Sequence, residues 1–218
     1  MFTEEFTIEK NKEELSTKSY NIIIGLVLLW GFAVNAVMCT LFQDFFAAWS
    51  SHMNAVIIGY LGIGFLGILI NAMSENSFIC FIAYNMVVLP LGVVLSITLG
   101  AYSHASIMKA LIVTILITLF MIILSCVKPE LFASMRKVLF TSLTAVVIIE
   151  LVMLFTGIYV PKWWDWLVAL LFCGYIGYDW YEAQQKERTV KNAIGSAFDL
   201  YLDIINLFLR ILEKTDDN

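Results

Sequence analysis

Two aspartates, Asp179 and Asp203, lie inside segments that are otherwise long and apolar enough to cross a membrane. A charged side chain at the centre of such a helix costs roughly 2.5 to 3.5 kcal/mol on insertion scales. Two of them on successive segments indicate that the side chains face each other or face water. Carboxyls that meet in a low-dielectric site cannot both stay charged, so they share a proton. The pair can bind a proton or attract a cation, and it is our first candidate for a functional site.

Asp203 belongs to a polar stripe in the last apolar segment. Successive polar residues are three or four positions apart, which places them on one face of a helix. The stripe consists of Asn192, Ser196, Asp199, Asp203, Asn206 and Arg210. A helix lying on the membrane surface is the alternative, but such helices favour Lys and Arg on their polar face rather than acids. We therefore expect a spanning helix whose stripe faces the protein interior.

The last two segments are antiparallel neighbours, so Asp179 can reach Asp203, and Asp199 lies one turn away as a candidate third carboxylate. A hard cation such as Ca²⁺ takes six to eight oxygen ligands. Two or three aspartates supply only part of that shell, so Ca²⁺ held at Asp179 and Asp203 would be transient. We expect no resident cofactor, with Ca²⁺ as a permeant ion. The alternative is a protonated pair that only holds two helices together.

Composition defines the elements that position these side chains. Apolar residues make up 61% of the 218-residue chain and charged residues 14%, against about 45–50% and 25% in soluble domains. We expect an all-α, multi-pass membrane bundle of seven transmembrane helices with a central C-terminal helix. The expected segments are approximately 20–42, 54–73, 78–100, 105–127, 137–159, 163–183 and 193–213. A tail over 1–19, a membrane domain over 20–213 and a short tail over 214–218 complete the organisation.

The distribution of Lys and Arg predicts the orientation in the membrane. Nine of the 13 basic residues fall on the side of the N-terminus and four on the other side. Cytoplasmic loops carry an excess of such residues. This favours a cell membrane protein with a cytoplasmic N-terminus and an external C-terminus, with an intracellular membrane such as the endoplasmic reticulum as the alternative. The expected partners are the lipid bilayer, Ca²⁺ and protons; membrane-protein partners stay unknown, and nucleic acid is excluded because no basic stretch exists.

The residues around the two aspartates resemble the C-terminal signature of the Bax inhibitor-1 (TMBIM) family of multi-pass proteins. The resemblance rests on Tyr178-Asp179 and on the string LYLDIINLF at 200–208, and it is strong over 174–212. It implies a pH-sensitive Ca²⁺ leak of the bacterial type, with Asp179 and Asp203 as a di-aspartyl pH sensor. In bacterial relatives a basic residue on the second helix latches onto the pair. The second segment here, 54–73, contains no Lys or Arg, so any latch must differ.

Glu150 is a further acid within an apolar segment, and Asn206 extends the stripe beyond Asp203. Glu150 is a candidate for a cation path, with a neutral, hydrogen-bonded buried acid as the alternative. The function we expect is a pH-sensitive Ca²⁺ leak channel, not an enzyme. The alternatives are a non-conducting membrane regulatory protein and a proton-coupled transporter. An intramembrane aspartyl protease is disfavoured, because Leu-Tyr-Leu rather than Gly-x-Gly precedes Asp203.

Overall fold

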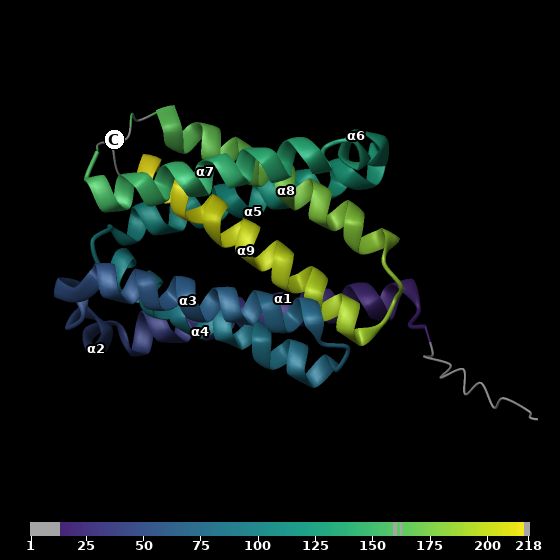
Figure 1. Ribbon diagram of the computed structural model, residues 1–218, viewed down its shortest axis with the longest axis horizontal. Coiled ribbons are helices and arrows are strands. Elements are labelled where there is room, and N and C mark those ends of the chain that lie inside the picture. Colours follow the sequence, from purple (N-terminus) through teal and green to yellow (C-terminus); the bar gives the residue numbers. More distant parts are fainter. Residues whose placement is uncertain (1–13, 159–160, 162, 216–218) are drawn as a thin grey trace, which may run out of the picture.

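The computed structural model describes residues 14–158, 161 and 163–215. Most of the predicted N-terminal tail, Lys162 and the end of the predicted C-terminal tail lie outside these residues. Within them the chain forms nine α-helices and one short 3-10 turn, with no strand (Figure 1). The prediction of an all-helical protein is therefore confirmed for the part of the chain that is described.

Seven of the helices are long. They are α1 (Thr17–Leu41), α3 (Met53–Met73), α4 (Ser77–Leu99), α5 (His104–Val127), α7 (Arg136–Thr156), α8 (Trp163–Gln185) and α9 (Val190–Thr215). Each matches one predicted segment to within a few residues. The shortest have 21 residues, which at 1.5 Å per residue corresponds to about 31 Å, close to the thickness of a bilayer core. Three short elements lie in the connections: α2 (Gln43–Ala47), the turn η1 (Ser50–His52) and α6 (Pro129–Ala133).

Polar residues at the helix ends explain several of these boundaries. The side chains of Ser16, Asn76 and Ser103 accept hydrogen bonds from backbone N–H groups in the first turns of α1, α4 and α5, as N-cap residues do. At the other end of α7, Gly157 takes a left-handed conformation with φ of 67°, the usual role of glycine after a helix. Capping residues therefore mark where several of the apolar helices begin and where α7 ends.

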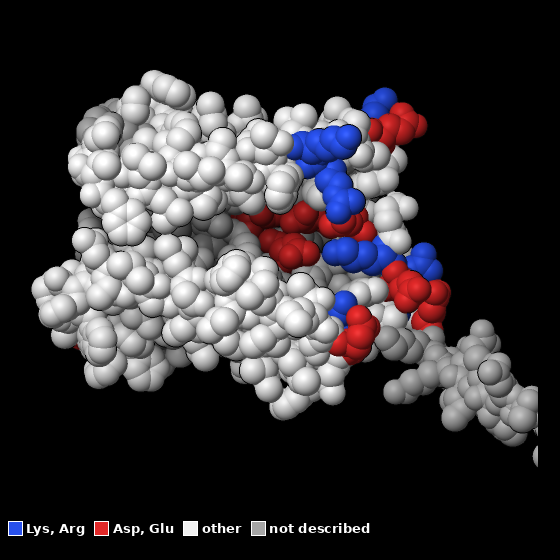
Figure 2. All heavy atoms as spheres, in the orientation of Figure 1, with Lys and Arg blue, Asp and Glu red and all other residues white. Residues whose placement is uncertain are grey.

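The outer surface is mostly apolar, which identifies a membrane protein. Large hydrophobic side chains such as Leu29, Phe65 and Phe120 are exposed, a pattern that soluble monomers avoid over large areas. In Figure 2 the charged side chains on the visible face gather at one end and inside a hollow, and the rest of that face carries almost none. Five helices are long and apolar enough to cross a membrane: α1, α3 with the turn before it, α4, α5 and α7. The seven predicted segments are therefore helices, and five of them meet this criterion.

The last helix, α9, is the centre of the bundle. It runs diagonally between a group formed by α1, α3 and α4 and a group formed by α5, α7 and α8 (Figure 1), and it contacts α1, α4, α5 and α8. Polar contacts fix its position: the Tyr20 hydroxyl lies 3.3 Å from the Ser196 hydroxyl, and the Asn35 amide donates to the Tyr201 hydroxyl. The prediction of a central C-terminal helix is confirmed.

Two helices, α3 and α7, each pack mainly against a single neighbouring helix. α3 packs mainly on α4, and α7 packs mainly on α8. At Gly67 the two backbones of the α3–α4 pair approach so closely that a Cβ there would lie 2.7 Å from the carbonyl oxygen of Ala83. α3 and α7 do not pack against each other closely, and the space between them is the hollow described next.

Candidate functional site

A cavity of about 590 Å³ opens between α3 and α7, with α8 and α9 as its other walls. Most of its lining is apolar, and its charged and amide groups come mainly from α9, with one acid each from α7 and α8. In Figure 2 acidic side chains are visible in a hollow of the molecule. The polar and charged residues that line the cavity include Asp179, Asp199, Asp203, Asn206, Arg210 and Glu150. All five residues that the sequence singled out, and Arg210 from the same stripe, therefore face one space.

The side chains of Asp179 on α8 and Asp203 on α9 lie beside each other and line the same cavity. Two adjacent carboxyls can be joined by a hydrogen bond only when one of them is protonated. Asp203 is 6% exposed, and its Oδ2 has no hydrogen-bond partner among the described residues. A buried oxygen without a partner is costly, and this one belongs to a side chain that lines the cavity.

Asp199 lies at the end of the cavity near the connection between α8 and α9. Its Oδ2 lies 3.6 Å from the ammonium nitrogen of Lys186. The same nitrogen lies 3.7 Å from Oε2 of Glu182 on α8. One cation of that connection therefore stands between two carboxylates, directly beside the Asp179–Asp203 pair.

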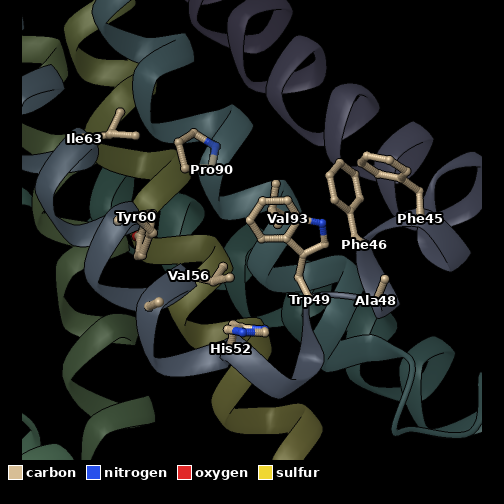
Figure 3. Close-up of a pocket in the computed structure, with 12 residues that line it drawn as sticks. Phe45, Phe46, Ala48, Trp49, His52, Val56, Tyr60, Ile63, Pro90 and Val93 are labelled. Carbon is tan, nitrogen blue, oxygen red and sulfur yellow. The ribbon is translucent and has the colours of Figure 1, made fainter.

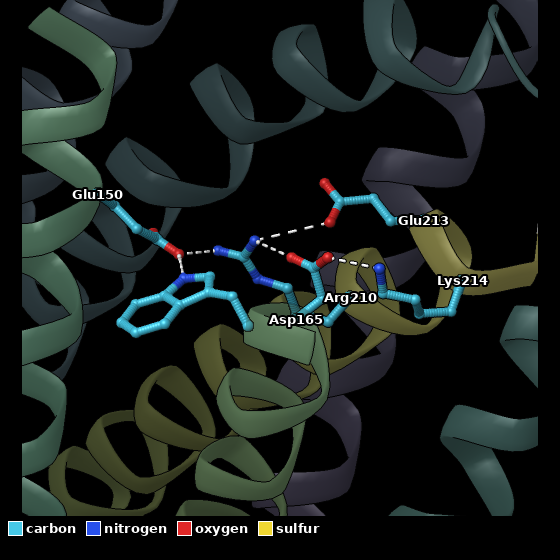
Figure 4. A network of polar contacts seen from close by, with 6 residues as sticks. Glu150, Asp165, Arg210, Glu213 and Lys214 are labelled. Carbon is cyan, nitrogen blue, oxygen red and sulfur yellow. Dashed lines mark hydrogen bonds and ion pairs between the residues drawn. The ribbon is translucent and has the colours of Figure 1, made fainter. Parts of the chain in front are cut away.

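A second charged cluster closes the opposite end of the cavity and joins three helices (Figure 4). Arg210 of α9 pairs with Glu150 of α7 and lies 3.2 Å from Asp165 of α8. Lys214 lies 2.7 Å from the other oxygen of Asp165, and Glu213 lies 3.6 Å from Arg210. Because Arg210 is only 20% exposed, its contacts with α7 and α8 are poorly screened.

Glu150 does not have the environment expected for a neutral buried acid, because a basic side chain pairs with it. It forms an ion pair with Arg210, and it accepts a hydrogen bond of 3.4 Å from the indole nitrogen of Trp164. No local pattern pairs Glu150 with Arg210, because 60 residues separate them. Its proposed role on a cation path stays a prediction.

The cavity holds carboxylates without forming a metal centre. Within the described part of the chain, no three or more His, Cys, Asp or Glu side chains are grouped so that they could hold a metal ion. The Asn206 amide donates to the backbone carbonyl of Leu202 at 2.8 Å, which leaves its oxygen as the group that can face an ion. Any cation here would keep much of its water shell, in line with passage rather than storage.

A separate cavity of about 620 Å³ lies between α2, η1, α3 and α4 (Figure 3). Its walls are apolar and aromatic, including Phe46, Trp49 and Pro90, and they carry no carboxylate. Tyr60 of α3 lines both this cavity and the acid cavity. Among the residues that line it, His52 can bind a proton, but no carboxylate is present to attract a cation, so the acid cavity is the better candidate.

Lys186 and Asp165 are among the site residues that were not predicted from the sequence. A signal existed for Lys186: Asp179, Glu182 and Lys186 follow each other at three and four positions, so they share a face of α8 and its continuation. For Asp165 no such signal was available, because its partners Arg210 and Lys214 reach it only through the packing of α8 against α9.

Comparison with known proteins supports the membrane assignment. The family described as "Inhibitor of apoptosis-promoting Bax1" matches residues 13–215. Protein LIFEGUARD 3 of Arabidopsis thaliana is 52% identical over 46 residues, which are 21% of this chain and 18% of that protein. The match thus spans less than a fifth of the relative's length. No solved structure matches the chain.

Proposed function

Because the chain belongs to the Bax inhibitor-1 family, we propose that it is a membrane protein through which Ca²⁺ leaks down its gradient, with the Asp179–Asp203 pair as the pH-dependent gate. The observation that carries the proposal is the unpartnered Oδ2 of Asp203, buried beside a second carboxyl in a cavity. Such an oxygen is stabilised by a proton or by a cation. In the proposed function, this oxygen binds a proton in the closed state and attracts a cation in the open state.

The proposed gate works through the number of protons on the pair. With one proton, the hydrogen bond between Asp179 and Asp203 ties α8 to α9. Without it, two adjacent negative charges repel each other and attract a cation. Ca²⁺ can then enter the space between α3 and α7, where these helices do not pack closely on one another. Lower pH favours the tied state, so the leak should decrease as the pH falls.

We also propose that α8 and α9 cross the membrane, which makes seven crossings in all. Both helices are long enough, and the polar residues of α9 face the cavity and its neighbours rather than the apolar outer surface. A polar stripe inside a bundle is compatible with a spanning helix. The excess of Lys and Arg on the side of the N-terminus supports a cytoplasmic N-terminus in a cell membrane.

The test is Ca²⁺ flux into proteoliposomes that contain the purified full chain, measured from pH 5 to 8. We expect the parent to pass Ca²⁺ with a flux that changes at least severalfold over this range. Asp203→Asn and Asp179→Asn should each remove the pH dependence, because an amide cannot lose the shared proton. Asp44→Asn is the matched control, since Asp44 lies on α2, away from the cavity.

Unchanged pH dependence in both cavity variants would contradict the gate. A parent that folds and passes no Ca²⁺ at any pH would contradict the channel and favour a non-conducting regulatory protein. A flux of Ca²⁺ that requires an opposing proton gradient would instead indicate a proton-coupled transporter.

A further inference from the structure

A small polar pocket of about 270 Å³ adjoins the acid cavity at the α8–α9 connection. It is lined by side chains that include Lys186, Lys191, Asn192 and Asn71. Asp199 belongs to the walls of both spaces. We call this pocket the vestibule, because it lies between the acid cavity and the end of the bundle where α1 begins.

Lys186 is the charged group at the boundary between the vestibule and the acid cavity. Its ammonium nitrogen lies 3.6 Å from Asp199 and 3.7 Å from Glu182, and its side chain is 32% exposed. The other lysine of the vestibule, Lys191, is directed elsewhere: it lies 3.7 Å from Glu75 in the α3–α4 connection. Only one of the two lysines is therefore paired with a carboxylate of the acid cavity.

We infer that Lys186 is a tethered cation that occupies the mouth of the acid cavity and must be displaced when a metal cation enters from the vestibule. This inference deepens the proposed function and rests on the part of it in which the acid cavity takes up a cation. It makes Lys186 the residue that sets how tightly the cavity holds that ion. Its ammonium group already satisfies Asp199 and Glu182, so an arriving ion must compete with it.

The charge of Lys186 is stable over the physiological range. Burial alone would lower the pKa of Lys186, but the carboxylates of Asp199, Glu182 and Asp179 outweigh burial and raise it. Lys186 thus stays protonated throughout pH 5–8, and it does not itself respond to pH there. Its contribution should be a constant reduction in cation affinity, on top of the pH response of the carboxyls.

The test measures binding of Tb³⁺, a luminescent substitute for Ca²⁺, to the purified full chain in detergent at fixed ionic strength and pH 7. Lys186→Met keeps the aliphatic stem and removes the charge. We expect it to bind Tb³⁺ roughly tenfold more tightly, because a positive charge that lies 3.6 Å from a carboxylate oxygen of Asp199 is lost. Lys186→Arg keeps the charge and should stay within about twofold of the parent. Lys191→Met is the matched control from the same vestibule and should also stay near the parent.

The variant Asp203→Asn identifies which part of the Tb³⁺ signal comes from the acid cavity. If Asp203→Asn weakens binding and Lys186→Met leaves it at the parent value, the inference is wrong and the proposed function stands. If Asp203→Asn has no effect on Tb³⁺ binding, the acid cavity takes up no cation, and both are overturned. An equal gain in Lys191→Met and Lys186→Met would show a general surface-charge effect and would also overturn the inference.

Discussion

At the residue scale, the two ends of the acid cavity are closed by different chemistry. Toward one end lie Asp179 and Asp203, which a shared proton joins in the proposed gate and deprotonation separates. At the other end Arg210 holds Glu150 and Asp165 with a charge that no accessible pH removes. Helix α7 is thereby fixed at one end to α9 and is held elsewhere mainly by α8. In the proposed gate, loss of the shared proton would leave the ion pairs of Arg210 intact.

The Arg210 cluster should contribute measurably to stability. Arg210→Met leaves Glu150 and Asp165 without their arginine, so we expect a loss of about 2–3 kcal/mol. Glu150→Gln can still accept from Arg210 and Trp164, so the loss should be nearer to about 1 kcal/mol. Thermal denaturation of the purified protein in detergent measures both. Glu130→Gln on the exposed surface of α6 is the control, and equal melting temperatures for all three variants would show that the cluster adds no stability.

The sequence predicted the acids of the site better than their basic partners. The stripe on α9 was readable because helical periodicity fixes which residues share a face, and Asp203, Asn206 and Arg210 do line one cavity. The pairing of Arg210 with Glu150 depends on the register between α9 and α7, which no local pattern encodes. For the same reason, the roles of Lys186 and Asp165 emerged only from the packed structure.

At the element scale, the least apolar of the long helices is the most enclosed one. α9 contacts four other long helices and buries residues on most of its surface, so its polar residues are shielded from lipid by protein. The apolar helices α3, α5 and α7 lie at the periphery and expose large side chains. High average hydropathy therefore marks helices apolar enough to cross a membrane, and it does not identify the helix around which they assemble.

The contact between α3 and α4 provides a test of how closely the backbones of these two helices must approach. Gly67→Ala would place a Cβ 2.7 Å from the backbone oxygen of Ala83, and backbone cannot move aside as easily as a side chain. We expect a loss of stability of about 1–3 kcal/mol, measured as a lower melting temperature in detergent. Gly62→Ala on the same helix is the control, because no atom lies within 4 Å of the added group. If both variants melt alike, the close approach at Gly67 is not required.

At the scale of the whole molecule, the helices alternate in direction along the chain. α1 begins at one end of the bundle and α9 finishes at the other (Figure 1). The backbone N–H of Leu15 bonds to the carbonyl of Arg188 at 2.8 Å, so the start of α1 and the α8–α9 connection lie at the same end. The vestibule and Lys186 therefore belong to the side on which α1 begins.

This arrangement predicts that the two termini lie on opposite sides of the membrane. Reporter domains fused separately to each end of the chain should give opposite signals, with the N-terminal reporter active in the cytoplasm. The expected result follows from an odd number of crossings and from the excess of basic residues on one side. A cytoplasmic signal from both fusions would contradict seven crossings and would place α9 only partly across the membrane.

The enclosed position of α9 also has a consequence for biosynthesis. α9 is made after the helices that surround it, and its stripe of acids and amides makes it a poor substrate for insertion into lipid by itself. The earlier helices must therefore be present, with a gap between them, before α9 can leave the translocation machinery. In a cell, α9 would then fill a space left between helices that were inserted before it. A chain truncated before α9 would present that unfilled gap to the quality-control proteases.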